Sequence, residues 1–210
     1  MNLLYLTLRG GYKMFGINER TTSLMKNFTN MILLNLLWIL CSLPILTIGP
    51  STAAMTNVIR SWKIDQEDSV FRSYFNGFRR YAKSGWIGTL WLLGGLVLII
   101  DVLLFFQISS SLKVFILSIA GMALILYLLT TTFLFPVLVH YETSGFKLIK
   151  KSFTHAFMDG STSIGIVLLW TAAGTLIYIM PILTFLLVVP VFMVTFRFCL
   201  RSFDKVGVNV

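Results

Sequence analysis

Apolar stretches long enough to cross a lipid bilayer are the feature that most constrains how this chain folds. A spanning helix needs about 20 predominantly apolar residues, because each residue advances the helix by about 1.5 Å and the hydrocarbon core is about 30 Å thick. Such stretches run from about 28 to 48, from 86 to 106 and from 114 to 139. A further apolar block, from about 164 to 200, is too long for one span.

Pro181 divides this last block, because a proline cannot continue the hydrogen bonding of a helix. We therefore predict two spans here, about 164–180 and 182–200, joined by a tight turn. The fold class that follows is all-α: a polytopic transmembrane helix bundle of about five spans, formed by one domain of residues 1–210. The composition agrees with a membrane protein, because 57% of the residues are hydrophobic and only 12% are charged. A soluble fold of this size could not bury so much apolar surface.

The basic residues gather in the segments between the spans. Residues 60–85 contain six Lys and Arg, residues 140–160 contain three, and residues 107–113 contain only Lys113. Cytoplasmic loops carry an excess of Lys and Arg. We therefore place 60–85, 140–160 and the C-terminus on the cytoplasmic side of a bacterial plasma membrane. We interpret the net charge of +9 as the charge that orients the protein in the membrane, and not as a surface that binds nucleic acid.

Two topologies remain open for the N-terminal part. Four basic residues precede the first span, yet a single span before a cytoplasmic loop places them outside. Alternatively, the chain breaks at Pro44 or at Gly49-Pro50 and returns as a half-helix through 51–62. Such a segment is tolerated only where protein or water satisfies its backbone. Of the two, we favour five spans with an outside N-terminus.

Two amphipathic segments precede later spans, at about 69–84 and 146–158. On a helix, the aromatic and aliphatic residues of the first segment occupy one arc, and its basic residues occupy the opposite arc. Those basic residues are Arg72, Arg79, Arg80 and Lys83. This pattern predicts cytoplasmic helices that lie in the inner headgroup layer. The second segment shows the pattern more weakly.

Two polar residues inside the predicted spans, Asp101 and Asn35, are candidates for a specific role. Asp101 is acidic, and an intramembrane carboxylate invites a functional hypothesis such as a proton or substrate contact. Because Asp101 lies in the last third of its span, near the outer interface, we favour an interfacial or packing role. Asn35 is expected to hydrogen-bond a neighbouring helix, a contact worth about 1 kcal/mol.

The sequence offers no enzyme template. It contains no HExxH, GxSxG, Walker A or GxGxxG motif. His140 and His155 are far apart in sequence and have no ligand at metal-binding spacing, and Cys41 and Cys199 are expected to be packing residues. We therefore expect no catalytic residue, no cofactor and no metal site.

The segment NLLWILCSLPILTIGPSTAAM, residues 35–55, is the most distinctive in the chain. We read it as an apolar helix interrupted at Pro44, stopped by Gly49-Pro50 and restarted with Ser51 or Thr52 as a cap. Together with the basic, Phe-rich segment and FPVLVHYE at 135–142, it resembles the YesL-like family of bacterial integral membrane proteins, a domain-of-unknown-function family. Pro44, Gly49, Pro50 and Thr52 match the pattern of that family.

The resemblance implies a function but supplies no site residues. Members of the family occur alongside carbohydrate-uptake and polysaccharide-degradation genes, so the resemblance implies an accessory role in sugar import. We expect a non-enzymatic accessory membrane protein whose partners are the lipid bilayer and membrane transport subunits. The alternative is an autonomous small-solute transporter or channel, which would show several polar groups along a pathway.

Overall fold

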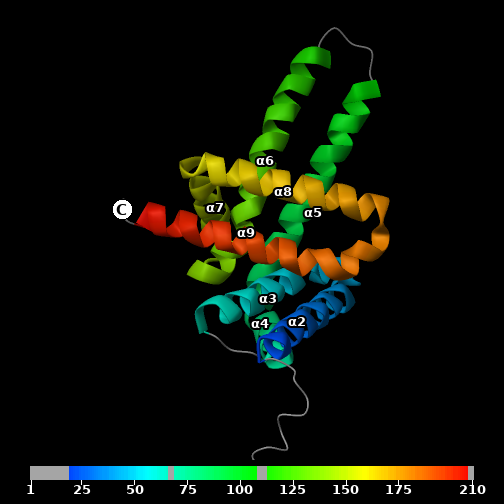
Figure 1. Ribbon diagram of the computed structural model, residues 1–210. Coiled ribbons are helices and arrows are strands. Elements are labelled where there is room, and N and C mark those ends of the chain that lie inside the picture. The colour runs from blue at the N-terminus through cyan, green and yellow to red at the C-terminus, as the bar shows by residue number, and fades with distance from the viewer. Residues whose placement is uncertain (1–18, 66–68, 108–112, 208–210) are drawn as a thin grey trace, which may run out of the picture.

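The structure is a computed structural model that describes residues 19–65, 69–107 and 113–207, and these residues are helical over most of their length (Figure 1). The prediction of an all-α bundle is confirmed. Five segments are long and apolar enough to cross a bilayer: Leu24–Ser42, Ala82–Gln107, Lys113–Tyr141, Gly160–Ile179 and Pro181–Lys205. The described part of the chain thus has the form of a multi-pass membrane protein.

Short elements alternate with these long helices. In chain order the structure contains α2 (Glu19–Ser42), the 3-10 turn η2 (Ile45–Thr47), α3 (Ile48–Arg60), the π-helical turn η3 (Ser61–Asp65), α4 (Val70–Arg80), α5 (Ala82–Gln107), α6 (Lys113–Tyr141), α7 (Phe146–Met158), α8 (Gly160–Ile179), the 3-10 turn η4 (Pro181–Leu183) and α9 (Thr184–Gly207). Helices α5 and α6 pack as one pair, and α8 and α9 as another.

The first predicted span is wrong at its C-terminal end, because α2 ends at Ser42 rather than near residue 48. Leu43 comes next and precedes Pro44, and the residue before a proline is biased away from helical conformation. Gly49 and Pro50 do not stop a helix but lie in the first turn of α3. Proline is tolerated there because the first N–H groups of a helix have no intrahelical partner. The N-cap of α3 is Thr47, not Ser51 or Thr52.

The first amphipathic segment also differs from the prediction of one helix over 69–84. Helix α4 ends at Arg80, the chain bends at Tyr81, and α5 begins at Ala82. Tyr81 is 3% exposed and belongs to the central apolar cluster. Anchoring this side chain in the core allows the chain to leave the direction of α4 and start the long helix.

Helix α3 is the centre of the bundle. Ten of its 13 residues are buried, and it contacts α2, α4, α5, α6 and α9. At about 1.5 Å per residue it extends for about 20 Å, which is too short to cross the hydrocarbon core. Its first half is built from small residues, and small residues let helix backbones approach closely within a membrane.

Glycines make the contact between α3 and α5. A Cβ added at Gly85 would lie 2.6 Å from the Cα of Pro50, and a Cβ added at Gly49 would overlap the carbonyl oxygen of Gly85. Real Cβ atoms essentially never come so close to backbone. The two helices therefore touch backbone to backbone, at a distance that only glycine allows.

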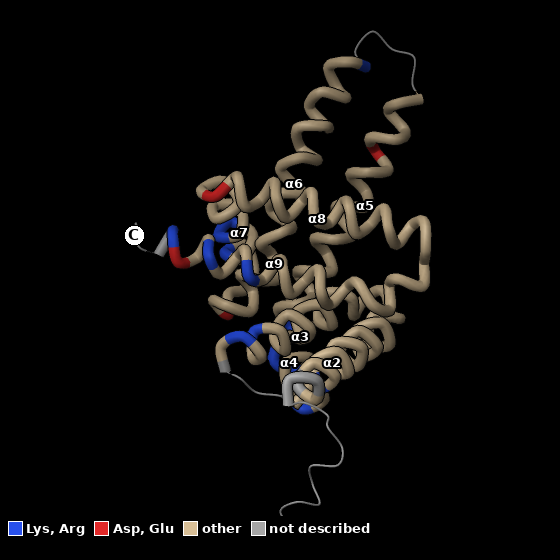
Figure 2. Tube along the Cα trace, in the orientation of Figure 1, with Lys and Arg blue, Asp and Glu red and all other residues tan. Residues whose placement is uncertain are grey.

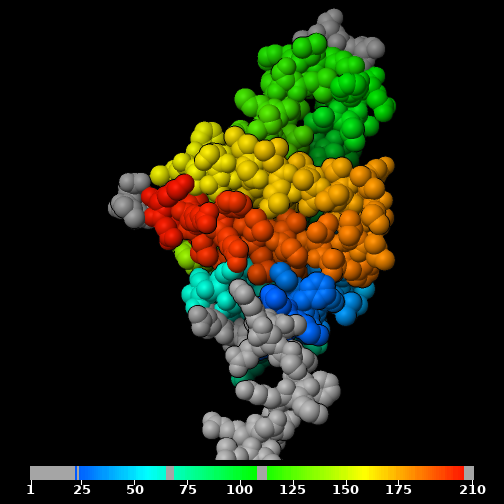
Figure 3. All heavy atoms as spheres, in the orientation of Figure 1, coloured from blue at the N-terminus to red at the C-terminus, as the bar shows by residue number. Residues whose placement is uncertain are grey.

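The outer halves of α5 and α6 project from the rest of the bundle, as the green segments of Figures 1 and 3 show. Trp91 holds the two helices together where they leave the bundle. Its Nε1 donates to the Thr131 hydroxyl at 2.9 Å, and its ring stacks on Tyr127 with the centroids 5.1 Å apart. Beyond this point the apolar side chains are largely exposed, as expected of helices surrounded by lipid.

Helices α2 and α3 run in opposite directions. Ser42, at the end of α2, hydrogen-bonds Ser51, near the start of α3, at 2.9 Å. Asn27, from the first turns of α2, lines one pocket with Lys63, just after α3, and Arg197 of α9. The first turns of α2 therefore lie beside the end of α3 and the middle of α9.

This geometry supports the topology in which the chain returns after the break, rather than the favoured one with N- and C-terminal parts on opposite sides. Figure 2 shows most Lys and Arg residues around α3, α4, α7 and the C-terminal part of α9, and we call this region the basic end. The basic residues Arg9 and Lys13 lie outside the described residues.

We predict that Gly85→Ala destabilises the protein by about 1–3 kcal/mol, because the added methyl group meets the Pro50 backbone, which cannot rotate away. Gly94→Ala is the matched control, since a Cβ at Gly94 on the same helix has no neighbour within 4 Å. Thermal unfolding in a mild detergent measures both. Equal stability of the two variants would contradict the close contact between α3 and α5.

We also predict that Thr22 and Asp204 lie on the same side of the membrane and Gln107 on the other. Single cysteines at these exposed positions, in a Cys41→Ala/Cys199→Ala background, are treated with a membrane-impermeant maleimide before and after permeabilisation. Thr22→Cys and Asp204→Cys should be labelled in the same step, and Gln107→Cys should be labelled in the other step. Opposite labelling of Thr22→Cys and Asp204→Cys would restore the topology with one span before α4.

Candidate functional site

The predicted structural motif surrounds the break between α2 and α3. Its members are Pro44, Gly49, Pro50 and Thr52. The Gly49 N–H donates to the Thr89 hydroxyl at 3.0 Å, and the Thr52 hydroxyl accepts from Trp38 Nε1 at 3.1 Å. Thr89 also donates to the Leu46 carbonyl at 3.1 Å. These bonds tie the break to α2 and α5, so the motif has a structural role.

Side-chain hydroxyls also bond carbonyls near the end of α2. The Thr47 hydroxyl donates to the carbonyl of Cys41, one of the last four residues of α2, at 2.6 Å, and the Ser51 hydroxyl donates to the carbonyl of Trp38, just before those four, at 3.1 Å. The last four carbonyls of any helix lack intrahelical partners. In an apolar environment, partners for them must come from the protein itself. The hydroxyl groups of the motif therefore make the break tolerable.

The four basic residues of the first amphipathic segment all lie on the surface: Arg72, Arg79, Arg80 and Lys83. Arg80 also forms an ion pair with Glu142, directly after α6. The aromatic arc of the segment is divided, because Tyr74 is fully buried whereas Phe71 and Phe75 are about half exposed. Part of the arc thus packs against the protein rather than into the headgroup layer.

The two polar residues of the spans occupy different environments. Asn35 is buried, and its Nδ2 donates to the carbonyl of Phe185 at 2.8 Å, which joins α2 to α9. Asp101 is exposed in the second half of α5, the half that projects from the bundle. The structure therefore does not bring Asn35 and Asp101 into one site.

The two histidines, distant in sequence, meet at the basic end. The ring centroids of His140 and His155 each lie 4.9 Å from the ring centroid of Phe203. Burial lowers the pKa of His155, and the nearby charges of Lys151 and His140 lower it further. Among residues 19–65, 69–107 and 113–207, no group of three or more His, Cys, Asp or Glu side chains could hold a metal ion.

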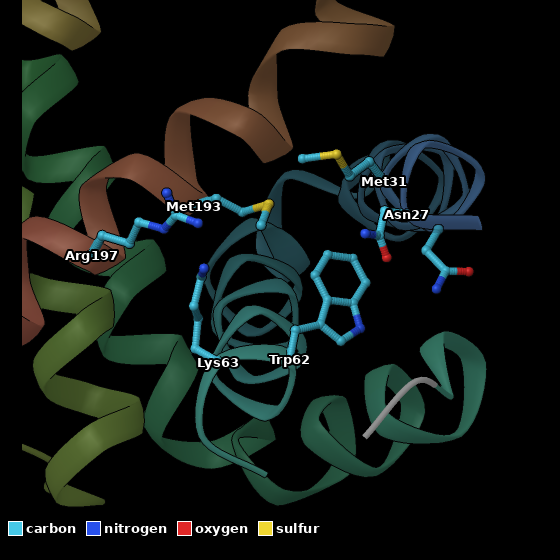
Figure 4. A pocket seen from close by; sticks show the side chains of 7 residues that line it. Asn27, Met31, Trp62, Lys63, Met193 and Arg197 are labelled. Atoms are coloured by element: carbon cyan, nitrogen blue, oxygen red, sulfur yellow. The ribbon is translucent and has the colours of Figure 1, made fainter. Parts of the chain in front are cut away.

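A cavity of about 300 Å³ opens at the basic end, between α2, η3 and α9. Its lining residues are Asn27, Asn30, Met31, Trp62, Lys63, Met193 and Arg197, and we call this cavity the cationic pocket. Figure 4 shows Lys63 and Arg197 on one side, Asn27 on the other side and Trp62 between them. A volume of this size can accept a small molecule or a headgroup.

The π-helical turn η3 places two consecutive residues, Trp62 and Lys63, in the lining. Single π-helical turns occur frequently at functional sites. Burial lowers the pKa of Lys63, and the positive charge of Arg197 lowers it further. The two cations are thus close enough to repel each other, and the pocket is a candidate site for an anion.

Sequence reasoning did not identify this pocket. Lys63 and Arg197 counted only as loop charges, and Asn27, Asn30 and Trp62 carried no motif. Lys63 and Arg197 are 134 positions apart in sequence, and the asparagines of α2 reach them only because the chain returns after α2. A run of Trp and Lys at the end of a small-residue helix is the only local signal.

Comparison with known proteins gives one match. A family model described as "Protein of unknown function, DUF624" matches residues 31–102, which include the second half of α2, all of α3 and α4, and most of α5. No curated protein and no solved structure matches the chain. The match covers less than half of the chain but contains the break, the buried half-helix and the basic helix α4. Over this segment, the chain is similar to a family of unknown function.

Proposed function

We propose that this protein is a non-enzymatic accessory component of a membrane transport system that takes up carbohydrates. In this proposal the protein resides in the bacterial plasma membrane, and the basic end, including the C-terminal part of α9, faces the cytoplasm. The orientation rests on the excess of Lys and Arg at that end. The association with carbohydrates rests on the family resemblance of residues 35–55.

The observation that carries an accessory role is the use of polar groups in the spans. Trp91 donates to Thr131 between α5 and α6, Trp170 donates to Thr195 between α8 and α9, and Asn35 donates across to α9. These groups join one helix to the next. A transport pathway needs polar groups that face a substrate near the midplane. Polar groups that hydrogen-bond neighbouring helices are not free to line such a pathway. This use of the polar groups supports an accessory role rather than transport by the protein itself.

The surface of the basic end supports docking to a transport subunit with acidic cytoplasmic loops. Helix α4 exposes Arg72 and Arg79 beside Phe71 and Phe75. Helix α7 adds an exposed lysine and exposed phenylalanines: Lys147, Phe146, Phe153 and Phe157. Arginine and aromatic residues are enriched at the energetic centres of protein interfaces. Opposite charge on a partner would favour both encounter and orientation.

The cationic pocket favours a second candidate function, the autonomous transport of a small anionic solute. It presents two cations, Lys63 and Arg197, to a cavity of about 300 Å³, which is large enough for a small solute. This candidate predicts that the purified protein alone moves solute across a membrane, which an accessory protein does not do.

We predict that purification in mild detergent recovers a carbohydrate permease subunit in a 1:1 ratio with the protein. The variant Arg72→Gln/Arg79→Gln should weaken this association, because it removes two exposed cations while leaving the Arg80 ion pair intact. Lys113→Gln, at the projecting tip of α6, is the control. Quantitative mass spectrometry of the purified complex measures the ratio.

Two outcomes would overturn the accessory role. One is a complex that lacks any transport subunit in the wild-type protein. The other is solute uptake by the purified protein alone in proteoliposomes, which would establish the second candidate function. Equal recovery of the permease with wild type and Arg72→Gln/Arg79→Gln would remove α4 from the interface.

A further inference from the structure

The cationic pocket holds two basic side chains, Lys63 and Arg197, that pair with no acidic side chain of the described residues. Among the residues that the structure describes, the ion pairs are Arg80–Glu142 and Lys205–Asp159, and neither involves Lys63 or Arg197. The lining residues that the structure describes include no Asp or Glu. Two like charges that share a partly buried site disfavour each other's charged state. An anion bound between the two cations would attract both of them and would favour their charged states.

The rest of the lining supplies hydrogen-bond donors. Asn27 and Asn30 contribute side-chain amides, and each amide group offers two N–H donors. The Nε1 of Trp62 is buried, and it lies on the side of the ring away from Lys63 and Arg197 (Figure 4), so the indole offers the pocket its ring rather than its N–H. The described lining therefore combines the amide donors of the two asparagines with two cations.

The apolar part of the lining limits the kind of anion. Met31, Met193 and the ring of Trp62 form surface suited to carbon atoms. A cavity of about 300 Å³ exceeds the needs of a bare inorganic ion. A lysine, an arginine and several N–H donors are the groups with which proteins bind phosphate oxygens.

We propose that the cationic pocket binds the phosphate group of an organic phosphate, with Lys63 and Arg197 on the phosphate oxygens and Trp62 and the two methionines against the organic part. Such a phosphate can belong to an anionic lipid headgroup or to a soluble phosphate ester. This inference goes beyond the accessory role and does not depend on it, because it concerns the pocket and not the α4 surface.

The test uses the full-length protein in phosphatidylcholine nanodiscs. In the first arm, isothermal titration calorimetry measures the binding of glycerol 3-phosphate, with glycerol as the uncharged comparison. In the second arm, thermal unfolding compares nanodiscs with and without phosphatidylglycerol. Binding in the first arm identifies a soluble ester. Stabilisation only in the second arm identifies a lipid headgroup.

The variants assign the effect to the pocket. Lys63→Gln and Arg197→Gln should each weaken binding roughly tenfold to a hundredfold, because each removes a charge-assisted hydrogen bond. Arg201→Gln, an exposed arginine one turn further along α9, should leave binding unchanged. Trp62→Phe keeps an apolar ring but lacks the N–H, and it should weaken binding less than Lys63→Gln or Arg197→Gln does. Unfolding of each variant without ligand shows that the fold is intact.

Several results would overturn the proposal. Absence of both calorimetric binding and lipid-dependent stabilisation would show that the pocket takes no phosphate. An equal loss in Arg201→Gln and Arg197→Gln would assign the effect to general surface charge. If Arg197→Gln does not fold, Lys63→Gln decides, because its side chain follows α3 in η3 and leaves the α9 contacts unchanged. A failed pull-down of the permease would not affect these results.

Discussion

The break between α2 and α3 exposes backbone groups in an environment where only the protein can satisfy them. Thr47, Ser51 and Thr89 donate to carbonyls of α2 and η2, at distances between 2.6 and 3.1 Å. Because such groups are costly to leave unpaired in an apolar medium, these hydroxyls determine whether the chain can turn back at all. The position of every later element depends on that reversal.

The reversal places a 13-residue helix of small residues at the centre of the bundle. Gly49 and Gly85 then allow α3 and α5 to meet backbone to backbone. Such contacts matter in a membrane, because lipid tails are as apolar as the side chains and close packing replaces the hydrophobic effect as the source of stability. The apparent interruption of an apolar span is thus the structural core of the protein.

The same reversal of the chain brings basic side chains together at one end of the bundle. The start of α2, the end of α3 and the C-terminal part of α9 meet at the basic end, and their side chains form the cationic pocket. Beside it, α4 exposes arginines and phenylalanines on its outer surface. The two proposals therefore concern one end of the molecule: an acidic protein surface is proposed at α4, and a phosphate group is proposed in the pocket.

The fold class, the count of long apolar helices and the break at Pro181 follow from local properties, and these were predicted from the sequence. Length and apolarity alone decide whether a segment suits hydrocarbon, and proline acts on its immediate neighbours. The amphipathic pattern of Arg72 to Lys83 is equally local, and all four basic residues are exposed in the structure.

Other features could not be predicted, because they depend on which residues meet in space. Gly49 and Pro50 read as a stop signal, yet they begin α3, since the first turn of a helix tolerates proline and α5 offers a glycine opposite. Tyr74 reads as a lipid-facing aromatic, yet it is buried against α3. Lys63 and Arg197 read as unrelated loop charges. The sequence by itself determined which segments prefer lipid, because that preference belongs to each segment alone. The tertiary structure alone decided where the chain reverses and which charges share a pocket, because those depend on contacts between distant residues.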